Sequence, residues 1–250
     1  MEFFDMAVQA SSANMPVVLL KDGASQTKGR DAQKNNIAAA KIIAEIVHTS
    51  LGPRGMDKML VDSLGDVTIT NDGATILKEI DVQHPAAKML VEIAKSTDNE
   101  VGDGTTSAVV LAGALLEQAE SLLLQEVHPT VIVDGYRKAA NKAKQYIKEI
   151  ADQVTADDKS TLLKIAKTSM QTKLVRKDSD QLADMVVKSV LAVAEKGDNN
   201  YTVDIDDIKV EKKSGGSISE SSILQGIVLD KEVVHSGMPK KITGAKIALI

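Results

Sequence analysis

The sequence predicts a mainly α-helical unit with one small β-hairpin, followed by an α+β segment and the start of an α/β unit. Apolar residues recur at helical spacing through much of residues 31–150, and two prolines, Pro85 and Pro129, stand where helices should begin. Beyond residue 199 the pattern changes to alternation and short β-like runs. These observations predict a helical fold that gives way to mixed structure toward the C-terminus.

The first expected elements are a short strand and a helix. Residues 17–20 form an apolar run that ends at a KDG turn, which is typical of a strand. Within residues 31–50 the apolar side chains fall on one helical face. The members of this face are Ala39, Ile42, Ile43, Ile46 and Val47. The LGPRG stretch at 51–55 has two glycines around a proline, and it should end this helix.

Two short strands are expected next, at residues 59–61 and 67–70. The SLGD segment at 63–66 lies between them and is rich in residues that favour turns. We therefore expect the two strands to pair as a hairpin.

Three helices are predicted after the hairpin. The first begins at Pro85, the second near Thr105 and the third at Pro129, and residues 99–104 interrupt the first two. The second helix has a wide apolar face and is expected to be deeply buried. That face consists of Ala108, Leu111, Ala112, Leu115, Leu116, Ala119 and Leu122. The third helix is expected to turn another apolar set inward, namely Ile132, Tyr136, Ala139, Ala143, Ile147 and Ile150.

The composition changes near residues 155–158, which we interpret as a domain boundary. Two shorter helices are expected at about 162–166 and 182–194, the second closed by Gly197. Alternation at 201–210 and β-like runs at 223–229 and 245–250 follow, with a Gly/Ser-rich segment at 214–222. Because the chain stops inside an apolar strand pattern, and a buried terminal strand needs neighbours, we expect a truncated chain.

The amino-acid composition argues against several classes of function. A hydrophobic fraction of 43% and a charged fraction of 26% are typical of a soluble globular protein. The net charge of -5 and the 2% of aromatic residues argue against a nucleic-acid partner. There is no cysteine, which excludes disulfides and thiolate sites and favours the cytoplasm. The apolar stretch at 107–116 is too short to cross a bilayer, so no membrane association is expected.

Two glycine-centred acidic loops, at 71–75 and 102–107, are the candidates for chemistry. In the second loop, glycines allow close approach to an anion, and a Thr-Thr-Ser run begins a helix, where free amides favour phosphate. Asp103 among such amides requires a cation between it and the phosphate, and Mg²⁺ fits that role.

Simpler interpretations of these segments stay open. Asp103 and Gly104 can form a plain turn, and Thr105 or Thr106 can be an ordinary helix cap. Asp72 can be a turn residue, and the stretch at 51–55 can be only a helix terminator. The chain has no Walker motif, no metal-ligand spacing among its four histidines and no hydrolase nucleophile elbow.

The order of four motifs makes the chain recognisable. They are TSLGPRGMDKM at 49–59, NDGATIL at 71–77, GDGTTS at 102–107 and VHPT at 127–130. With these neighbours the sequence, from about residue 17 to residue 250, resembles the N-terminal half of a group II chaperonin subunit. That family includes the thermosome and the cytosolic ring chaperonins.

The resemblance implies binding of ATP and Mg²⁺ and assigns roles to individual residues. Asp72 would lie beside the γ-phosphate and the attacking water, and Lys173 would approach the γ-phosphate when the subunit closes; these two are the catalytic candidates. Asp103 would ligate Mg²⁺. The residues implied to contact the nucleotide are Leu51, Gly52, Pro53, Gly73, Gly104, Thr105, Thr106, Ser107, Thr172 and Lys173.

The resemblance also implies a domain plan and a function. The parts are a flexible N-terminus (1–16), an equatorial ATP-binding domain (17–156), an intermediate hinge domain (157–223) and the start of an apical substrate-binding domain (224–250).

The expected function is ATP-driven folding of unfolded client proteins, in a double ring formed with other chaperonin subunits in the cytoplasm. In the family a second carboxylate that activates water comes later in the chain, so these 250 residues alone are expected to be an inactive ATPase. The alternative is a truncated, non-hydrolysing module for nucleotide or ring contacts.

Overall fold

The computed structural model describes residues 26–197, 201–227 and 231–247. The strand expected at 17–20 and the flexible segment at 1–16 lie outside these residues. The described helices are α1 (Gly29–His48), α2 (Gly73–Glu79), α3 (Pro85–Val101), α4 (Thr105–Leu124), α5 (Pro129–Ile150), α6 (Lys159–Met170) and α7 (Ser179–Val193). The described strands are β1 (Lys58–Val61), β2 (Val67–Thr70), β3 (Glu195–Lys196) and β4 (Tyr201–Thr202). Mainly helical structure with a small hairpin is what the sequence predicts, and the prediction is confirmed.

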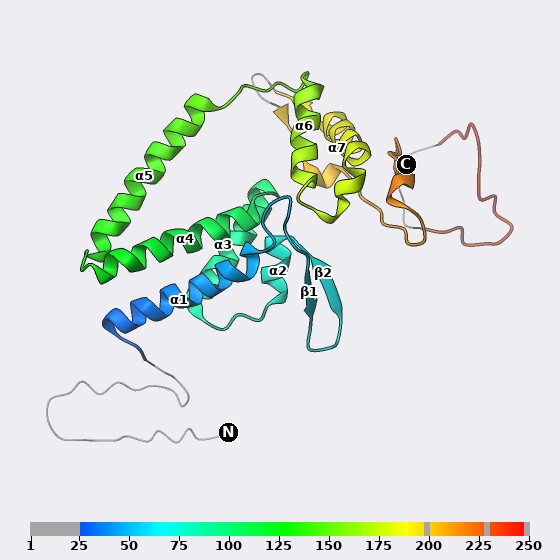
Figure 1. Ribbon diagram of the computed structural model, residues 1–250. Coiled ribbons are helices and arrows are strands. Elements are labelled where there is room, and N and C mark those ends of the chain that lie inside the picture. Colours follow the sequence, from blue (N-terminus) through cyan, green and yellow to red (C-terminus); the bar gives the residue numbers. More distant parts are fainter. Residues whose placement is uncertain (1–25, 198–200, 228–230, 248–250) are drawn as a thin grey trace, which may run out of the picture.

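The core lies where α1, α2, α3 and α4 pack together (Figure 1). Its buried side chains are Ala40, Ile43, Ala44, Val47, Ala74, Ile76, Leu77, Ala87, Leu90, Val91, Ala94 and Val109. Helices α1 and α4 approach closely at Gly113, because a Cβ atom placed there would collide with the Cβ of Ala44. This layer supports the loops that form the candidate site.

The hairpin β1–β2 is antiparallel, with Met59 opposite Ile69 and Val61 opposite Val67. Its turn is held by Asp62, whose carboxylate accepts hydrogen bonds from the amides of Leu64 and Asp66 at 2.9 and 2.8 Å. The predicted strand at 67–70 is confirmed, and the first strand begins one residue earlier than expected.

The three predicted helix starts are also confirmed. Pro85 and Pro129 each occupy the first turn of a helix, and the ring Nδ1 atoms of His84 and His128 accept backbone hydrogen bonds as N-caps. Thr105 begins α4. Proline suits these positions because the first amides of a helix have no intrahelical acceptor.

The expected deep burial of α4 is wrong, because only Ala119 of the seven residues predicted for its apolar face is buried. Val109, Gly113 and Ala119 are buried against the neighbouring helices, but Leu111 is 61% exposed and Leu115 41%. The reason is that α1 and α3 cover one side of α4 only. By length and composition alone this 20-residue helix could cross a membrane, a test that a core helix of a soluble protein also passes.

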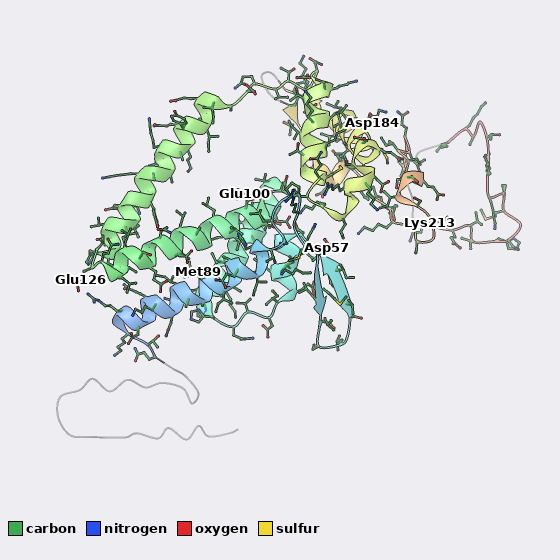
Figure 2. All side chains as sticks on the ribbon, viewed as in Figure 1. Asp57, Met89, Glu100, Glu126, Asp184 and Lys213 are labelled. Atoms are coloured by element: carbon green, nitrogen blue, oxygen red, sulfur yellow. The ribbon has the colours of Figure 1, made fainter. Side chains whose placement is uncertain are left out.

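Helix α5 also differs from expectation. Only Ile132 of its predicted inward set is buried, whereas Ile147 is 61% and Ile150 69% exposed. After the turn at Glu126, α5 diverges from α4, and over most of its length the helix stands apart from the other described elements (Figures 1 and 2). Among the described residues, no element packs along its apolar stripe.

Helices α6 and α7 pack on each other and on a short 3₁₀ helix between them, η1 (Leu174–Asp178). Both helices are longer than the sequence predicts, and α7 ends at Val193 instead of being closed by Gly197. Two short 3₁₀ helices follow, η2 (Ile205–Asp207) and η3 (Ile218–Glu220). Residues 223–227 and 245–247, the described parts of two expected β-like runs, form no strand with any other described residues.

Candidate functional site

The candidate site is centred on Asp72, directly after β2. Its carboxylate caps α2 by accepting hydrogen bonds at 3.0 Å from both the amide and the hydroxyl of Thr75. The sequence analysis did not predict this seven-residue helix. The turn role considered for Asp72 is therefore replaced by a helix cap, which holds the carboxylate in a fixed orientation.

The start of α4 lies against the start of α2. The hydroxyl of Thr105 donates to Oδ1 of Asp72 at 3.4 Å, across 33 residues of sequence. Only glycine fits at position 73, between the two helices. A Cβ atom there would stand 2.6 Å from the Oγ1 of Thr106 and 2.9 Å from its backbone nitrogen. Thr105 and Thr106 are both buried. Two loops that are separate in sequence thus form one surface.

The loop before α4 leads into backbone amides that no side-chain cap satisfies, and it carries one exposed carboxylate. Gly102 and Gly104 have φ angles of 71° and 75°, a left-handed conformation that glycine adopts without strain. Gly104 itself is the N-cap, and no side chain in the described part of the chain caps the first amides of α4. Thr105 and Thr106 are thus inside the helix and do not cap it. The uncapped amides are suited to an anion.

Asp103 is exposed at this helix start and accepts a hydrogen bond from the amide of Gly104 at 2.8 Å. Ser107 is exposed as well. Within the described ranges no group of three or more acidic, His or Cys side chains could hold a metal. A single exposed carboxylate fits Mg²⁺, which is commonly held by one or two carboxylates together with the phosphates of a nucleotide.

Lys173 reaches the site from the turn between α6 and η1. Its Nζ lies 2.6 Å from Oδ1 of Asp72, and both side chains are partly buried. Burial alone would raise the pKa of Asp72. The hydrogen bond and charge of Lys173 and the hydrogen bonds from Thr75 outweigh that effect, so the pKa lies below the usual carboxyl value.

Two residues that the sequence analysis did not identify as site residues, Asn71 and Arg176, also form hydrogen bonds at the site. The side-chain amide of Asn71 donates to the backbone carbonyl of Thr172 at 2.7 Å. Arg176 donates from Nη1 to the backbone carbonyl of Pro53 at 3.2 Å. Both bonds connect a side chain to a distant backbone carbonyl, and such a contact leaves no pattern in the sequence.

The loop at 51–55 is thereby connected to the site through Pro53. The loop is a tight turn in which Gly52 has a φ of 81° and the amide of Gly55 donates to the carbonyl of Gly52 at 2.9 Å. Leu51 is partly exposed at the start of the turn. Of the predicted residues, the structure brings Thr105 and Lys173 onto Asp72 and Gly73 against Thr106, while Thr172 and Pro53 are joined to the site through Asn71 and Arg176. The other predicted residues line the loop surfaces without a hydrogen bond to Asp72, namely Leu51, Gly52, Asp103, Gly104 and Ser107.

Comparison with known proteins gives a consistent result. A model of the TCP-1/cpn60 chaperonin family matches residues 43–250. Over 241 residues the chain is 58% identical to the thermosome subunit alpha of Archaeoglobus fulgidus and 57% identical to the thermosome subunit beta of Thermococcus kodakarensis. A thermosome subunit of Pyrococcus abyssi is 55% identical. Each match covers 96% of this chain and 44% of the relative, so the chain spans less than half the length of these curated relatives.

Proposed function

The chain belongs to the TCP-1/cpn60 chaperonin family as a group II subunit, and from this we propose that the site around Asp72 binds Mg-ATP and contributes to its hydrolysis. The observation that carries the proposal is the convergence of three distant loops on one carboxylate. Thr105 from the start of α4 and Lys173 from beyond α6 both contact Oδ1 of Asp72. A fold does not need this arrangement for its own stability, because a solvated aspartate could cap α2 without either contact.

The start of α4 is proposed to hold the phosphates. Its uncapped amides and the positive end of the helix dipole attract an anion, and Gly104 with Thr105 to Ser107 supplies amides and hydroxyls. Gly73 leaves room for the close contact of the two helix starts. Leu51, Gly52 and Pro53 are proposed to cover the nucleotide from the neighbouring loop, and Thr172 is proposed to contact it beside Lys173.

Asp103 is proposed to ligate Mg²⁺, which when bound would neutralise phosphate charge and align the terminal phosphoryl group. The position of this carboxylate, exposed beside uncapped amides, is what supports the assignment. Without a cation, a carboxylate so close to bound phosphate would repel it.

Asp72 is proposed to orient the attacking water. A carboxylate with a lowered pKa is a weak base, so it is better suited to accept a hydrogen bond from water than to remove its proton early. Lys173 carries a flexible ammonium group, which is proposed to move from Asp72 to the γ-phosphate and stabilise the charge there. This movement would free Oδ1 of Asp72 for the water.

The test is nucleotide binding with a matched pair of variants. Titration calorimetry should show that the chain binds a non-hydrolysable ATP analogue with Mg²⁺, and that Asp103→Ala weakens binding by about tenfold or more, equivalent to about 1.4 kcal/mol. Asp152→Ala, which removes an exposed aspartate between α5 and α6, should leave binding unchanged. Equal binding by both variants would contradict the metal site.

Phosphate release, measured on this chain and on a family-length subunit that contains it, separates two versions of the proposal. Release that depends on Asp72 and Lys173 supports an ATPase. Tight binding without release in either protein supports the alternative, a nucleotide- or ring-contact module.

The wider role is proposed from the relatives, which are named as thermosome subunits. We propose unfolded proteins as clients and other chaperonin subunits in a double ring as partners, with no nucleic-acid or membrane partner. The net charge of -5 and the absence of cysteine support these proposals and a cytoplasmic location. We also propose the domain limits that the resemblance implies, near residues 156 and 223, and the exposed connection between α5 and α6 and the loop after η3 support this proposal.

A further inference from the structure

The junction between the α6–η1–α7 unit and the helical layer is made mainly of polar contacts. Extensive packing between described elements occurs within α1 to α4 and within the α6–η1–α7 unit, and no such packing joins the two parts (Figure 1). In the described part of the chain, the hydrogen bonds of Asn71 and Arg176 and the ion pair of Lys173 with Asp72 join the two parts. A junction with so little apolar burial can be rearranged without exposing a core.

The bond from Asn71 to Thr172 aligns the two partners of the ion pair. Asn71 directly precedes Asp72, and Thr172 directly precedes Lys173. Since the donor and the acceptor are each one residue from the ion pair, the 2.7 Å bond fixes the distance between the two backbones at that point. The long side chain of Lys173 would otherwise sample many positions.

The bond from Arg176 to Pro53 connects the same segment to the second loop. The amide of Arg176 donates to the carbonyl of Lys173 at 3.2 Å, so the guanidinium and the ammonium group belong to one turn. Pro53 lies in the tight turn between Gly52 and Gly55. One short segment, residues 172–176, is thus attached to two of the loops that are proposed to contact nucleotide, those at 51–55 and 71–75.

We propose that Asn71 and Arg176 are positioning residues, which hold the segment 172–176 on the two loops so that Lys173 rests on Asp72. Through these bonds, a displacement of either loop by bound phosphate changes the orientation of α6 and α7 relative to the helical layer. The second statement rests on the proposed function, while the first does not depend on nucleotide.

A distance measurement tests the positioning role directly. The chain has no cysteine, so Met89→Cys on α3 and Asp184→Cys on α7 provide two unique sites for spin labels on the two parts (Figure 2). Without nucleotide, Asn71→Ala and Arg176→Ala should each broaden the distribution of distances between the labels. Asn141→Ala, which removes an exposed asparagine on α5, should leave it unchanged. A wild-type distribution in both Asn71→Ala and Arg176→Ala would overturn the proposal.

Conservative variants distinguish positioning from a general loss of stability. Arg176→Lys keeps a cation that can donate to the carbonyl of Pro53, so it should restore most of the narrow distribution. In a Lys173→Ala background, Asn71→Ala should broaden the distribution further, because the bond to Thr172 joins the two backbones there without the ion pair. No further broadening in that background, or a failure of Arg176→Lys to restore the distribution, would contradict positioning.

Addition of Mg²⁺ and a non-hydrolysable ATP analogue tests the link to the proposed function. In the wild-type background the mean distance between the labels should shift, whereas Asn71→Ala/Arg176→Ala should bind the analogue without that shift. A chain that binds no analogue would contradict the proposed function, yet its nucleotide-free distributions would still decide the positioning role. A shift that persists in the double variant would contradict the coupling alone.

Discussion

Lys173 and Asp72 form an ion pair with 2.6 Å between Nζ and Oδ1, although 101 residues separate them in the chain. Thr75 and Thr105 contact the same carboxylate, so Asp72 is held by groups from three segments. Such a partly buried pair, with further hydrogen bonds to the carboxylate, contributes more to the free energy of folding than an exposed surface ion pair does.

The first prediction concerns Lys173. If its ammonium group acts on the γ-phosphate only after leaving Asp72, Lys173→Ala should lower phosphate release by about tenfold or more while Mg-ATP affinity changes by less than about threefold. Single-turnover kinetics and titration calorimetry on a family-length subunit provide the two measurements. Lys177→Ala, an exposed lysine of η1, is the control. A loss of affinity as large as that of Asp103→Ala would identify Lys173 as a ground-state contact.

The second prediction concerns the pH dependence of stability. The pKa of Asp72 is lower in the folded chain than the value of about 3.9 for an unfolded aspartate, so the folded state binds fewer protons in acid. The stabilisation is complete above the unfolded pKa and is lost as the pH falls through the folded pKa. Asp72→Asn should therefore reduce the steepness with which the free energy of unfolding declines below about pH 5, relative to wild type.

Urea unfolding at a series of pH values measures this difference. Asp152→Asn, at an exposed position between α5 and α6, should keep the wild-type steepness. Parallel curves for wild type and Asp72→Asn would show that the ion pair contributes nothing to stability.

The third prediction concerns the close contact of α1 and α4. Gly113→Ala places a Cβ atom against the Cβ of Ala44 and should destabilise the chain by about 1–3 kcal/mol through overpacking. Gly135→Ala makes the same change in α5, where open space surrounds the glycine, and should stabilise by up to about 1 kcal/mol. Urea midpoints of the two variants should move in opposite directions; an unchanged or higher midpoint for Gly113→Ala would mean that the α1–α4 contact is looser than described.

The fourth prediction concerns α5. Because Ile132 is the only buried residue of this helix, its hydrogen bonds have little apolar packing to protect them. Amide hydrogen exchange in residues 136–150 should be faster than in the first half of α4 by on the order of tenfold or more. Equal protection of the two segments would show that the apolar stripe of α5 is covered in solution, for example by association of chains.

The sequence by itself determined the local structure and the chemistry of the loops. Prolines at residues 85 and 129 identified helix starts, because the preference of proline for the first turn acts within a few residues. Two short strand-like runs and the turn residues between them located the hairpin. The motifs were specific enough to indicate the family and to select Asp72, Asp103 and Lys173 as candidates.

Tertiary structure decided which of these groups meet. Helix α2 was not predicted, since a seven-residue helix is not stable on its own and depends on packing against α3 and α4. The exposure of Leu111 and Ile147 depends on which neighbours cover a helix, and periodicity along one helix carries no such information. Asn71 and Arg176 act through the carbonyls of residues more than a hundred positions away. Backbone carbonyls are the same in every residue, so only the fold could reveal these partners.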